Sequence, residues 1–386
     1  MQINSGSSYK DIIIAGAGPA GCTAALKLRK SGLSILLIDK NTFPRDKVCG
    51  DAIGGRAVRV LSMLDPSFPE MLEKLEGVNK SAGWKLYAPN GKSVELHFTY
   101  PGHVARRQDF DNFLFRLVKD SGKIEIREGF QLKDVHAGGN FINITNDLGE
   151  SYHSKLLIAC DGAQSVVAKR LAKFRVDLSH YSGAVRAYYT NIKGIYDKEM
   201  IEIHLLKKYL PGYFWLFPLD ENSANVGFGM LSSDIARRKI NLKAAMEEII
   251  YNSPALKDRF KESIRTSDIS GFGLPLGGRD MEISGERFML CGDAASLIDP
   301  LNGEGIGNAM LSGLLAGEQA LKCFESDNFS VKMMKHYDDS VKHNLTAELK
   351  KKLTLQRLFN RSWLINGMVN AGLRFPLIKH FIGRHL

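Results

Sequence analysis

Three closely spaced glycines and one downstream acid form a pattern that binds dinucleotides. The glycines are Gly16, Gly18 and Gly21, and the acid is Asp39. The first glycine permits a sharp turn, the second lets the backbone approach a pyrophosphate, and the third lets a helix pack closely on a strand. The acid can accept hydrogen bonds from an adenosine ribose. The pattern predicts FAD or NAD without separating them, and a purely structural turn is the alternative. The predicted cofactor-binding residues of this segment are Gly16, Gly18, Pro19, Ala20, Gly21, Asp39 and Lys40.

Two further acids stand where buried strands are expected to end, in Asp161-Gly162 and in Gly292-Asp293. A buried carboxylate is costly unless it finds hydrogen-bond donors, and ribose or ribityl hydroxyls supply them. The following stretch, residues 299–306 (DPLNGEGI), offers backbone N–H groups at a helix start to the electron-rich pyrimidine edge of a flavin. Each motif alone is a plain turn, but their order behind the glycines indicates a flavin nucleotide. The contacts predicted here are Asp161, Gly162, Gly292, Asp293, Pro300, Gly303, Gly305 and Ile306.

The elements that must position these residues follow from the hydrophobic pattern. Apolar runs at Ile12–Ile14 and Ile35–Ile38 flank an alanine-rich helical segment, which is the strand, turn, helix, strand order of a Rossmann-type unit. Buried strands are expected at Tyr152–Cys160 and Arg287–Cys291, and one helix at about Ser232–Tyr251.

We therefore expect an α/β fold with an α+β insertion. Its parts are a Rossmann-type FAD-binding domain, a discontinuous β-sheet substrate domain and a helical C-terminal region. The predicted ranges are 1–75, 100–175 and 280–325 for FAD binding, 76–99 and 176–279 for the substrate domain, and 326–386 for the C-terminal region.

Together these motifs resemble the FAD-dependent oxidoreductases of the p-hydroxybenzoate hydroxylase-like superfamily. The resemblance covers three motifs spread over residues 11–308 and implies that they hold FAD. Arg107, followed by Phe110, Asp111 and Leu114, is similar to the second-helix pattern of that superfamily. This similarity implies that Arg107 lies close to the FAD.

Two stretches resemble the geranylgeranyl reductase group more narrowly. The first is residues 43–51 (FPRDKVCGD), which implies Arg45, Cys49 and Gly50 as cofactor contacts. The second is residues 212–218 (GYFWLFP), which the resemblance places on the sheet over the flavin. Archaeal members follow this stretch with Gly-Gly where this chain has Val226-Gly227, and that departure leaves the substrate open.

The resemblance implies reduction of an isoprenoid C=C bond, which needs a hydride from reduced flavin at one carbon and a proton at the other. Cys49 is a candidate proton donor or polar gate, with a small buried residue as the alternative, and nearby Asp51 is a second catalytic candidate. Tyr213, Trp215 and Phe217 alternate, so on a strand they share one face. They are the predicted substrate residues of an apolar tunnel, and a plain sheet core is the alternative.

Two other functions stay open at this point. One is a flavin monooxygenase or halogenase, because residues 212–218 also resemble the halogenase motif Trp-x-Trp-x-Ile-Pro, although Tyr213 replaces the first Trp. The other is a non-catalytic flavoprotein that binds a lipid or a partner protein. No second Rossmann glycine motif is present, so we expect NAD(P)H, bound transiently, or a ferredoxin to supply electrons.

The spacing of the cysteines and the distribution of charge limit the classes of ligand and partner that we expect. The five cysteines, Cys22, Cys49, Cys160, Cys291 and Cys323, have no Cys-x-x-Cys spacing, and we expect neither a disulfide framework nor a metal site. The net charge is +10, and the stretch from Leu349 to Leu386 has eight basic residues and no acid. Its basic residues alternate with Leu, Phe and Trp, which favours a solvated helix pair or contact with an anionic membrane over nucleic acid.

No apolar run approaches the ~18–20 residues that span a bilayer, and the first ten residues lack a signal-peptide core. We therefore expect a cytoplasmic protein, with peripheral contact at the inner membrane face as the alternative. The expected partner is an isoprenoid or another apolar small molecule.

Overall fold

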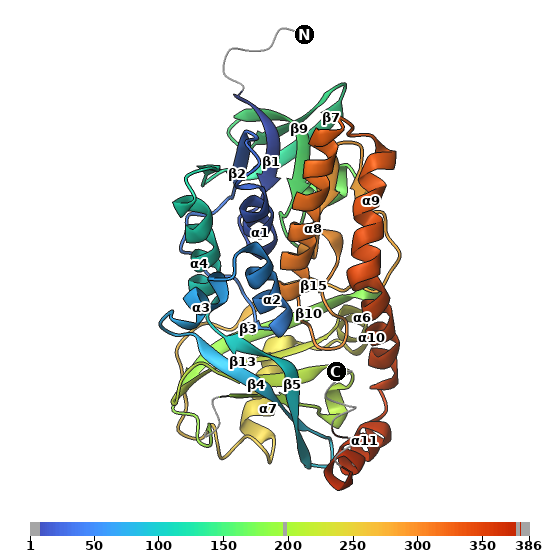
Figure 1. Ribbon diagram of the computed structural model, residues 1–386. Coiled ribbons are helices and arrows are strands. Elements are labelled where there is room, and N and C mark those ends of the chain that lie inside the picture. The colour runs from blue at the N-terminus through green and yellow to red at the C-terminus, as the bar shows by residue number, and fades with distance from the viewer. Residues whose placement is uncertain (1–7, 196–198, 376–378, 380–386) are drawn as a thin grey trace.

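The computed structural model describes residues 8–195, 199–375 and 379, and its strands form two sheets (Figure 1). The first sheet has, in spatial order, β16 (Ser284–Gly285), β17 (Phe288–Leu290), β9 (Ser151–Ala159), β1 (Ser8–Ala15), β2 (Ile35–Ile38) and β6 (Glu125–Arg127), and β8 (Phe141–Asn146) and β7 (Leu132–Gly138) extend it from β9. The run from β17 to β6 is parallel. Ile12, Ile13 and Ile14 of β1 are fully buried, as expected for a parallel strand covered on both faces.

The second sheet is mainly antiparallel. Its spatial order is β14 (Ile264–Arg265), β10 (Tyr181–Thr190), β13 (Ser223–Leu231), β12 (Tyr213–Pro218), β11 (Met200–His204), β4 (Asn79–Tyr87), β5 (Ser93–Val104) and β3 (Ala52–Ile53), and β15 (Ser270–Pro275) also pairs with β10. Only the β11–β4 pair among these described strands is parallel. In Figure 1 this sheet occupies the lower half of the molecule and the parallel sheet the upper half.

Helices cover the sheets and join them. The helices are α1 (Pro19–Leu28), α2 (Gly55–Leu64), α3 (Phe68–Glu73), α4 (Arg107–Asp120), α5 (Val166–Arg170), α6 (Ser232–Arg238), α7 (Leu242–Asn252), α8 (Ile306–Glu325), α9 (Val331–Val341), α10 (Ala347–Leu358) and α11 (Ser362–Arg374). Helix α8 lies tightly against α1, because a Cβ at Gly313 would be 2.2 Å from the carbonyl oxygen of Ala20. The small residues of α8 therefore permit a close helix pair.

The C-terminal region links the two halves. Helices α9 and α10 are joined by one π-helical turn, Lys342–Thr346, and run as one column along the side of both sheets (Figure 1). Helix α11 then packs its buried residues Ile365 and Val369 into an apolar cluster with Leu86 and Leu96 of the second sheet. This column brings residues from the last tenth of the chain to the junction of the sheets.

The predicted α/β class and the order of the first Rossmann unit are confirmed. The single helix expected at 232–251 is wrong. Lys239 adopts a left-handed conformation with φ +52°, which ends α6, and the Asn241 side chain accepts hydrogen bonds from the N–H groups of Lys243 and Ala244 to begin α7. The boundary expected at residue 100 falls inside β5, which continues in the second sheet to Val104.

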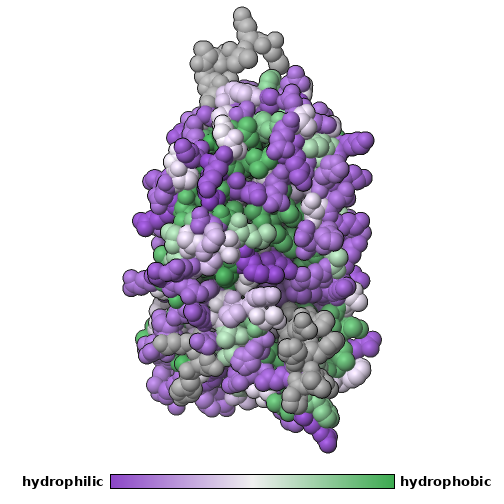
Figure 2. Space-filling view, viewed as in Figure 1, coloured by the Kyte–Doolittle hydropathy of each residue, from purple (hydrophilic) through white to green (hydrophobic). Residues whose placement is uncertain are grey.

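Polar and charged residues cover most of the face in Figure 2, and apolar residues reach its surface mainly over α1 and α8. Within the described ranges, no helix combines the length and the apolar character that crossing a membrane requires.

Candidate functional site

The turn between β1 and α1 has the geometry of a phosphate loop. Gly16 has φ +103°, and a Cβ there would lie 2.3 Å from the carbonyl oxygen of Cys160. A Cβ at Gly21 would lie 1.8 Å from the carbonyl oxygen of Gly16. Neither position therefore accepts a side chain. Helix α1 begins at Pro19 after Gly18, with no side-chain cap from the described residues, so the N–H groups of its first turn are suited to bind an anion.

Asp39 lies at the end of β2 and supports this loop directly. Its Oδ2 accepts a hydrogen bond from the N–H of Ala17 at 2.8 Å, and its Oδ1 accepts one from Asn41 at 2.8 Å. Each carboxylate oxygen keeps a lone pair that could accept a ribose hydroxyl. The neighbouring Lys40 is exposed, whereas Ala20 of α1 is buried against α8.

Asp111 of α4 joins the two predicted arginines. Arg107 donates from Nε and Nη2 to its two carboxylate oxygens, each at 2.7 Å, and Nη1 of Arg45 lies 2.9 Å from Oδ2. Burial opposes the charge on Arg107, but the Asp111 carboxylate outweighs it and raises the pKa of the guanidinium. Nη2 of Arg45 also lies 3.5 Å from where a Cβ of Gly18 would be. Fixed positive charge therefore stands beside the phosphate loop.

Asp161 follows β9 and has one oxygen left over. Its Oδ2 accepts hydrogen bonds from the N–H groups of Val166 at 2.7 Å and Val167 at 3.3 Å. Its Oδ1 is buried and has no hydrogen-bond partner among residues 8–195, 199–375 and 379. Burial raises the pKa of Asp161. An orphaned oxygen at this place fits a ligand hydroxyl.

Asp293 follows β17, which is the parallel neighbour of β9. Its Oδ2 accepts a hydrogen bond from Nζ of Lys47 at 3.0 Å. Gly292 before it has φ +59°, and a Cβ there would lie 2.9 Å from the Cβ of Ala309 in α8. Gly162 has φ +80° and opens onto free space. The predicted Asp161-Gly162 and Gly292-Asp293 motifs therefore lie side by side at the carboxyl ends of two neighbouring parallel strands.

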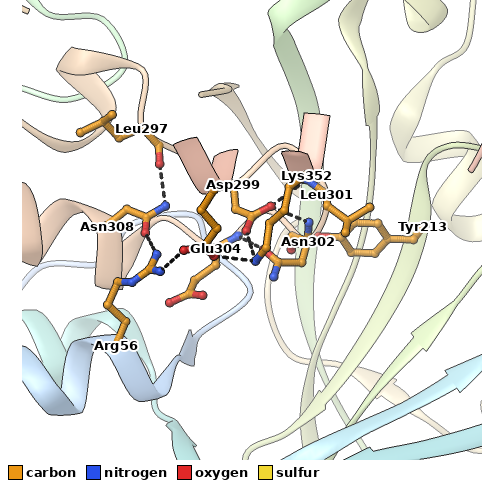
Figure 3. Close-up of polar contacts among 10 residues, drawn as sticks. Arg56, Tyr213, Leu297, Asp299, Leu301, Asn302, Glu304, Asn308 and Lys352 are labelled. Carbon is orange, nitrogen blue, oxygen red and sulfur yellow. Dashed lines mark hydrogen bonds and ion pairs between the residues drawn. The ribbon is translucent and has the colours of Figure 1, made fainter. Parts of the chain in front are cut away.

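The loop of residues 299–305 is held in place by α10 (Figure 3). Nζ of Lys352 lies 2.7 Å from Oδ2 of Asp299, whose side chain is 2% exposed. Nε2 of Gln356 donates to the carbonyl oxygen of Pro300 at 2.5 Å. The C-terminal helices thus fix the loop that is predicted to face the flavin.

The same loop contacts the aromatic strand. The hydroxyl of Tyr213 donates to the carbonyl oxygen of Asn302 at 2.6 Å (Figure 3). Gly303 has φ +75°, and a Cβ there would lie 2.8 Å from that hydroxyl oxygen. Gly305 precedes α8, whose first residue is Ile306. The predicted flavin loop and the predicted substrate strand are therefore in direct contact.

One cavity of about 420 Å³ lies between the sheets. The lining residues from the predicted cofactor set are Pro19, Cys49, Gly50, Arg107, Asp293, Gly303, Gly305 and Ile306. Those from the second sheet include Trp84, Ile201, Ile203, Tyr213, Trp215, Phe217 and Leu274, and those from the C-terminal region are Lys352, Gln356 and Phe359. The cavity is therefore mainly apolar on the sheet side and polar on the side of the cofactor loops.

The aromatic residues of β12 alternate as expected for a strand. Tyr213, Trp215 and Phe217 line the cavity, whereas Phe214 and Leu216 are buried on the other face of the sheet. A Cβ at Gly50 would lie 2.8 Å from the Phe217 ring and 3.5 Å from Nε1 of Trp215. The loop that carries Cys49 therefore rests directly on the aromatic strand.

Asp51 lies behind this wall and does not line the cavity. Its Oδ2 accepts hydrogen bonds from the hydroxyl of Tyr188 at 2.8 Å and from Nδ2 of Asn225 at 2.7 Å. Nδ2 of Asn225 also donates to the carbonyl oxygen of Cys49 at 2.7 Å, and its Oδ1 accepts from Trp215 at 3.0 Å. The geometry gives Asp51 contact with the residues that support Cys49, not with the cavity itself.

These features fit FAD. The glycine turn and Asp39 suit the ADP part, and the orphaned Asp161 oxygen with Asp293 suits the sugar hydroxyls. When bound, FAD supplies hydride and electron-transfer chemistry. The chain would hold the cofactor with α1, Arg45 and the 299–305 loop, and its apolar sheet face would exclude water from the reacting atoms.

Several residues that build the site had no role in the sequence-based prediction. Asn225 and Lys352 act through contacts between segments far apart in the chain, which no local pattern reveals. Lys47, Asp111 and Glu304 lie inside motifs that were recognised, so the sequence indicated their positions but not the residues that they contact. In the part of the chain that the structure describes, no group of three or more His, Cys, Asp or Glu side chains could hold a metal ion.

Comparisons with known proteins show the family of the chain. A model of the FAD binding domain family matches residues 9–319. The chain is 32% identical over 320 residues to the menaquinone reductase of Mycobacterium tuberculosis, which covers 80% of this chain and 76% of the relative. It is 31% identical over 363 residues to the digeranylgeranylglycerophospholipid reductase of Methanococcus vannielii, which covers 90% of this chain and 87% of the relative.

The fold is also that of a crystal structure of a geranylgeranyl bacteriochlorophyll reductase-like protein from Thermoplasma acidophilum. The TM-score is 0.82 at 24% identity, over 95% of this chain and 91% of the other. The chain therefore belongs to the FAD binding domain family, in the geranylgeranyl reductase group of the hydroxylase-like superfamily, and it is an FAD-dependent oxidoreductase.

Proposed function

We propose that this oxidoreductase reduces C=C bonds of an isoprenoid substrate of the geranylgeranyl type. The observation that carries the proposal is the cavity of about 420 Å³, because its wall joins the predicted flavin loops to an apolar sheet face. Transfer of a prenyl chain from water to such a surface is favourable by about 25 cal/mol per Å² of apolar surface buried. Tyr213, Trp215 and Phe217 would then guide the chain past the flavin.

The names of the relatives support a reductase and leave the head group open. One relative is named for a digeranylgeranyl glycerophospholipid and the other for a quinone. The two names specify different head groups, so the experiment below compares both. The monooxygenase or halogenase and the non-catalytic flavoprotein are the competing outcomes.

We further propose that electrons arrive from transiently bound NAD(P)H or from a ferredoxin. We also propose that the basic C-terminal helices rest on an anionic membrane. The exposed apolar residues Trp363, Leu373 and Phe375 lie among arginines at the end of the chain that the structure describes. A lipid substrate would be taken up from such a surface.

The test is anaerobic. The purified protein is assayed for bound FAD, reduced with dithionite, and mixed separately with geranylgeranyl diphosphate, a digeranylgeranyl glycerophospholipid and menaquinone. Flavin reoxidation with a product heavier by two hydrogens is the expected result. Exposure of the extracted product to air then separates the two sites of reduction, because a quinol returns to the quinone while a saturated chain stays reduced.

Two results would argue against the proposal. A flavin that stays reduced with every prenyl compound until oxygen is admitted indicates a monooxygenase or halogenase. A protein that binds prenyl compounds, with no turnover by dithionite, NAD(P)H or reduced ferredoxin, indicates a binding protein.

A further inference from the structure

Glu304 is an acidic residue of the cavity wall that has no role in the predicted cofactor site. It stands between Gly303 and Gly305, in the loop that α10 fixes, and it lines the cavity. In Figure 3 it lies between Arg56 of α2 and Lys352 of α10. The carboxyl group is packed on two glycines, because a Cβ at Gly54 would lie 2.4 Å from its Oε1 and a Cβ at Gly307 would lie 2.7 Å from it.

Its Oε1 is buried and has no hydrogen-bond partner in the described ranges. The two cations that act on Glu304, Arg56 and Lys352, pair with other residues. Arg56 donates to Asn308 and, at 2.5 Å, to Glu348, while Lys352 lies 2.7 Å from Asp299 and 3.2 Å from Glu348. This position favours the neutral acid, since Oε1 of the charged form would be buried without a hydrogen-bond donor.

The charged groups that act on Glu304 come from α2, α10 and its own loop. Burial raises the pKa of its carboxyl group, Arg56 and Lys352 lower it, and Asp299 and Glu348 raise it, with a net rise. A carboxyl group held neutral at the edge of a reaction cavity can donate a proton.

The other acids of the cavity are less suited. The hydroxyl proton of Tyr213 is engaged by the carbonyl oxygen of Asn302, and burial raises the pKa of Tyr213 strongly. Asp293 already accepts a hydrogen bond from Lys47. Cys49 remains a rival, and the experiment below includes it.

We propose that Glu304 is the general acid that protonates the substrate alkene. This inference rests on the proposed reductase function. The π bond of the alkene breaks, one carbon forms a C–H bond with hydride from the reduced flavin, and the other forms a C–H bond with the proton of the Glu304 carboxyl group. The alkene gains two electrons that the flavin loses, and the Glu304 carboxylate recovers its proton from water.

The test compares E304Q, E304D and C49A with the unmodified protein, each loaded with FAD and reduced anaerobically with dithionite. We expect E304Q to keep its FAD and its reduction by dithionite, and to slow flavin reoxidation by the prenyl substrate about 100-fold or more. The reoxidation rate of the unmodified protein should fall as pH rises through the pKa of Glu304. This fall of the rate with pH should be absent in E304Q and kept in both E304D and C49A.

A readout independent of turnover is the infrared carbonyl band of a protonated carboxylic acid, followed against pH in the FAD-loaded protein. We expect a component of this band at neutral pH that is missing from E304Q in the difference spectrum, in which the contributions of Asp51 and Asp161 cancel. Glu318 is the matched control, because it lies on α8, pairs with Lys27 at 2.9 Å and is 40% exposed outside the cavity; E318Q should behave as the unmodified protein.

Reoxidation of E304Q within twofold of the unmodified protein, or a Glu304 that is ionised at neutral pH, would overturn the proposal, and so would loss of the fall of the rate with pH in C49A alone. If E304Q fails to bind FAD, the infrared band and E304D decide the matter. Failure of the reductase function itself looks different, because the unmodified protein would then reoxidise with no prenyl compound while the Glu304 band could still be present.

Discussion

At the scale of single residues, the most consequential acid outside the cavity is Asp51. It is fully buried and held by the Tyr188 hydroxyl and the Asn225 amide, and Asn225 in turn holds the backbone of Cys49 and the indole of Trp215. Asp51 therefore acts on the cavity through other residues. Asp51 lies two residues after Cys49 in the sequence, so a motif alone does not distinguish a catalytic residue from one that supports Cys49.

Asp51 should make stability depend on pH. Burial raises its pKa from 3.8 to about 6, partly opposed by the hydrogen bonds from Asn225 and Tyr188. A raised pKa adds stability below about pH 4 that is lost as pH rises through about 6, and this shift corresponds to about 3 kcal/mol. The amide of D51N can still accept both hydrogen bonds but carries no charge. Denaturant unfolding from pH 4 to 8 should therefore show D51N gaining about 3 kcal/mol relative to the unmodified protein; a difference that does not change with pH would contradict this reading.

Gly50 should tolerate no side chain. A Cβ there would lie 2.8 Å from the Phe217 ring, so G50A must push the Cys49 loop away from the aromatic strand. We expect a loss of about 1–3 kcal/mol in the free energy of unfolding and slower turnover. Gly138 is the matched control, because it lies in β7, has an ordinary φ and would place a Cβ in open space. Calorimetry should show G138A close to the unmodified protein; equal effects of both substitutions would mean that packing on Phe217 is not the cause.

At the scale of elements, the features that could be predicted are those that residues close together in the sequence determine. The order β1, turn, α1, β2 follows from apolar runs and glycine spacing within thirty-odd residues, and it was found. The break between α6 and α7 was missed because Lys239 takes a left-handed conformation that its residue type does not announce. The support of the 299–305 loop by α10 could not be predicted, because Lys352 meets Asp299 only after the whole chain has folded.

Helix α10 should be needed for cofactor binding, and one lysine tests this. K352M leaves the Asp299 carboxylate, which is 2% exposed, without its partner at 2.7 Å, and breaking such a buried pair costs about 3–5 kcal/mol. We expect weaker FAD retention, measured by flavin fluorescence during dialysis. K350M removes an exposed lysine from the same helix, whose pair with Asp280 is worth at most about 1 kcal/mol. Similar FAD loss in both variants would show that helix α10 as a whole, and not this ion pair, is the sensitive feature.

At the scale of the whole molecule, the cavity and the basic end of the chain lie next to each other. Phe359 lines the cavity immediately before α11, and α11 exposes Trp363 and Leu373 between Arg361 and Arg374. Apolar side chains flanked by cations favour the interface of an anionic bilayer. A lipid that leaves such a surface would then have a short path into the cavity.

This arrangement predicts binding to anionic vesicles. In flotation experiments we expect the protein to rise with vesicles containing phosphatidylserine or phosphatidylglycerol and to remain below with phosphatidylcholine alone, and added salt should weaken the interaction because it screens surface charge. W363A should reduce flotation. Met63 of α2 is the matched control, because its side chain is 67% exposed, as is that of Trp363, but it lies outside the basic segment; M63A should float as the unmodified protein does. Equal recovery with neutral and anionic vesicles would show that the basic residues do not direct the contact. No recovery with either would separate lipid reduction from membrane contact and leave the cavity to take its substrate from solution or from a carrier.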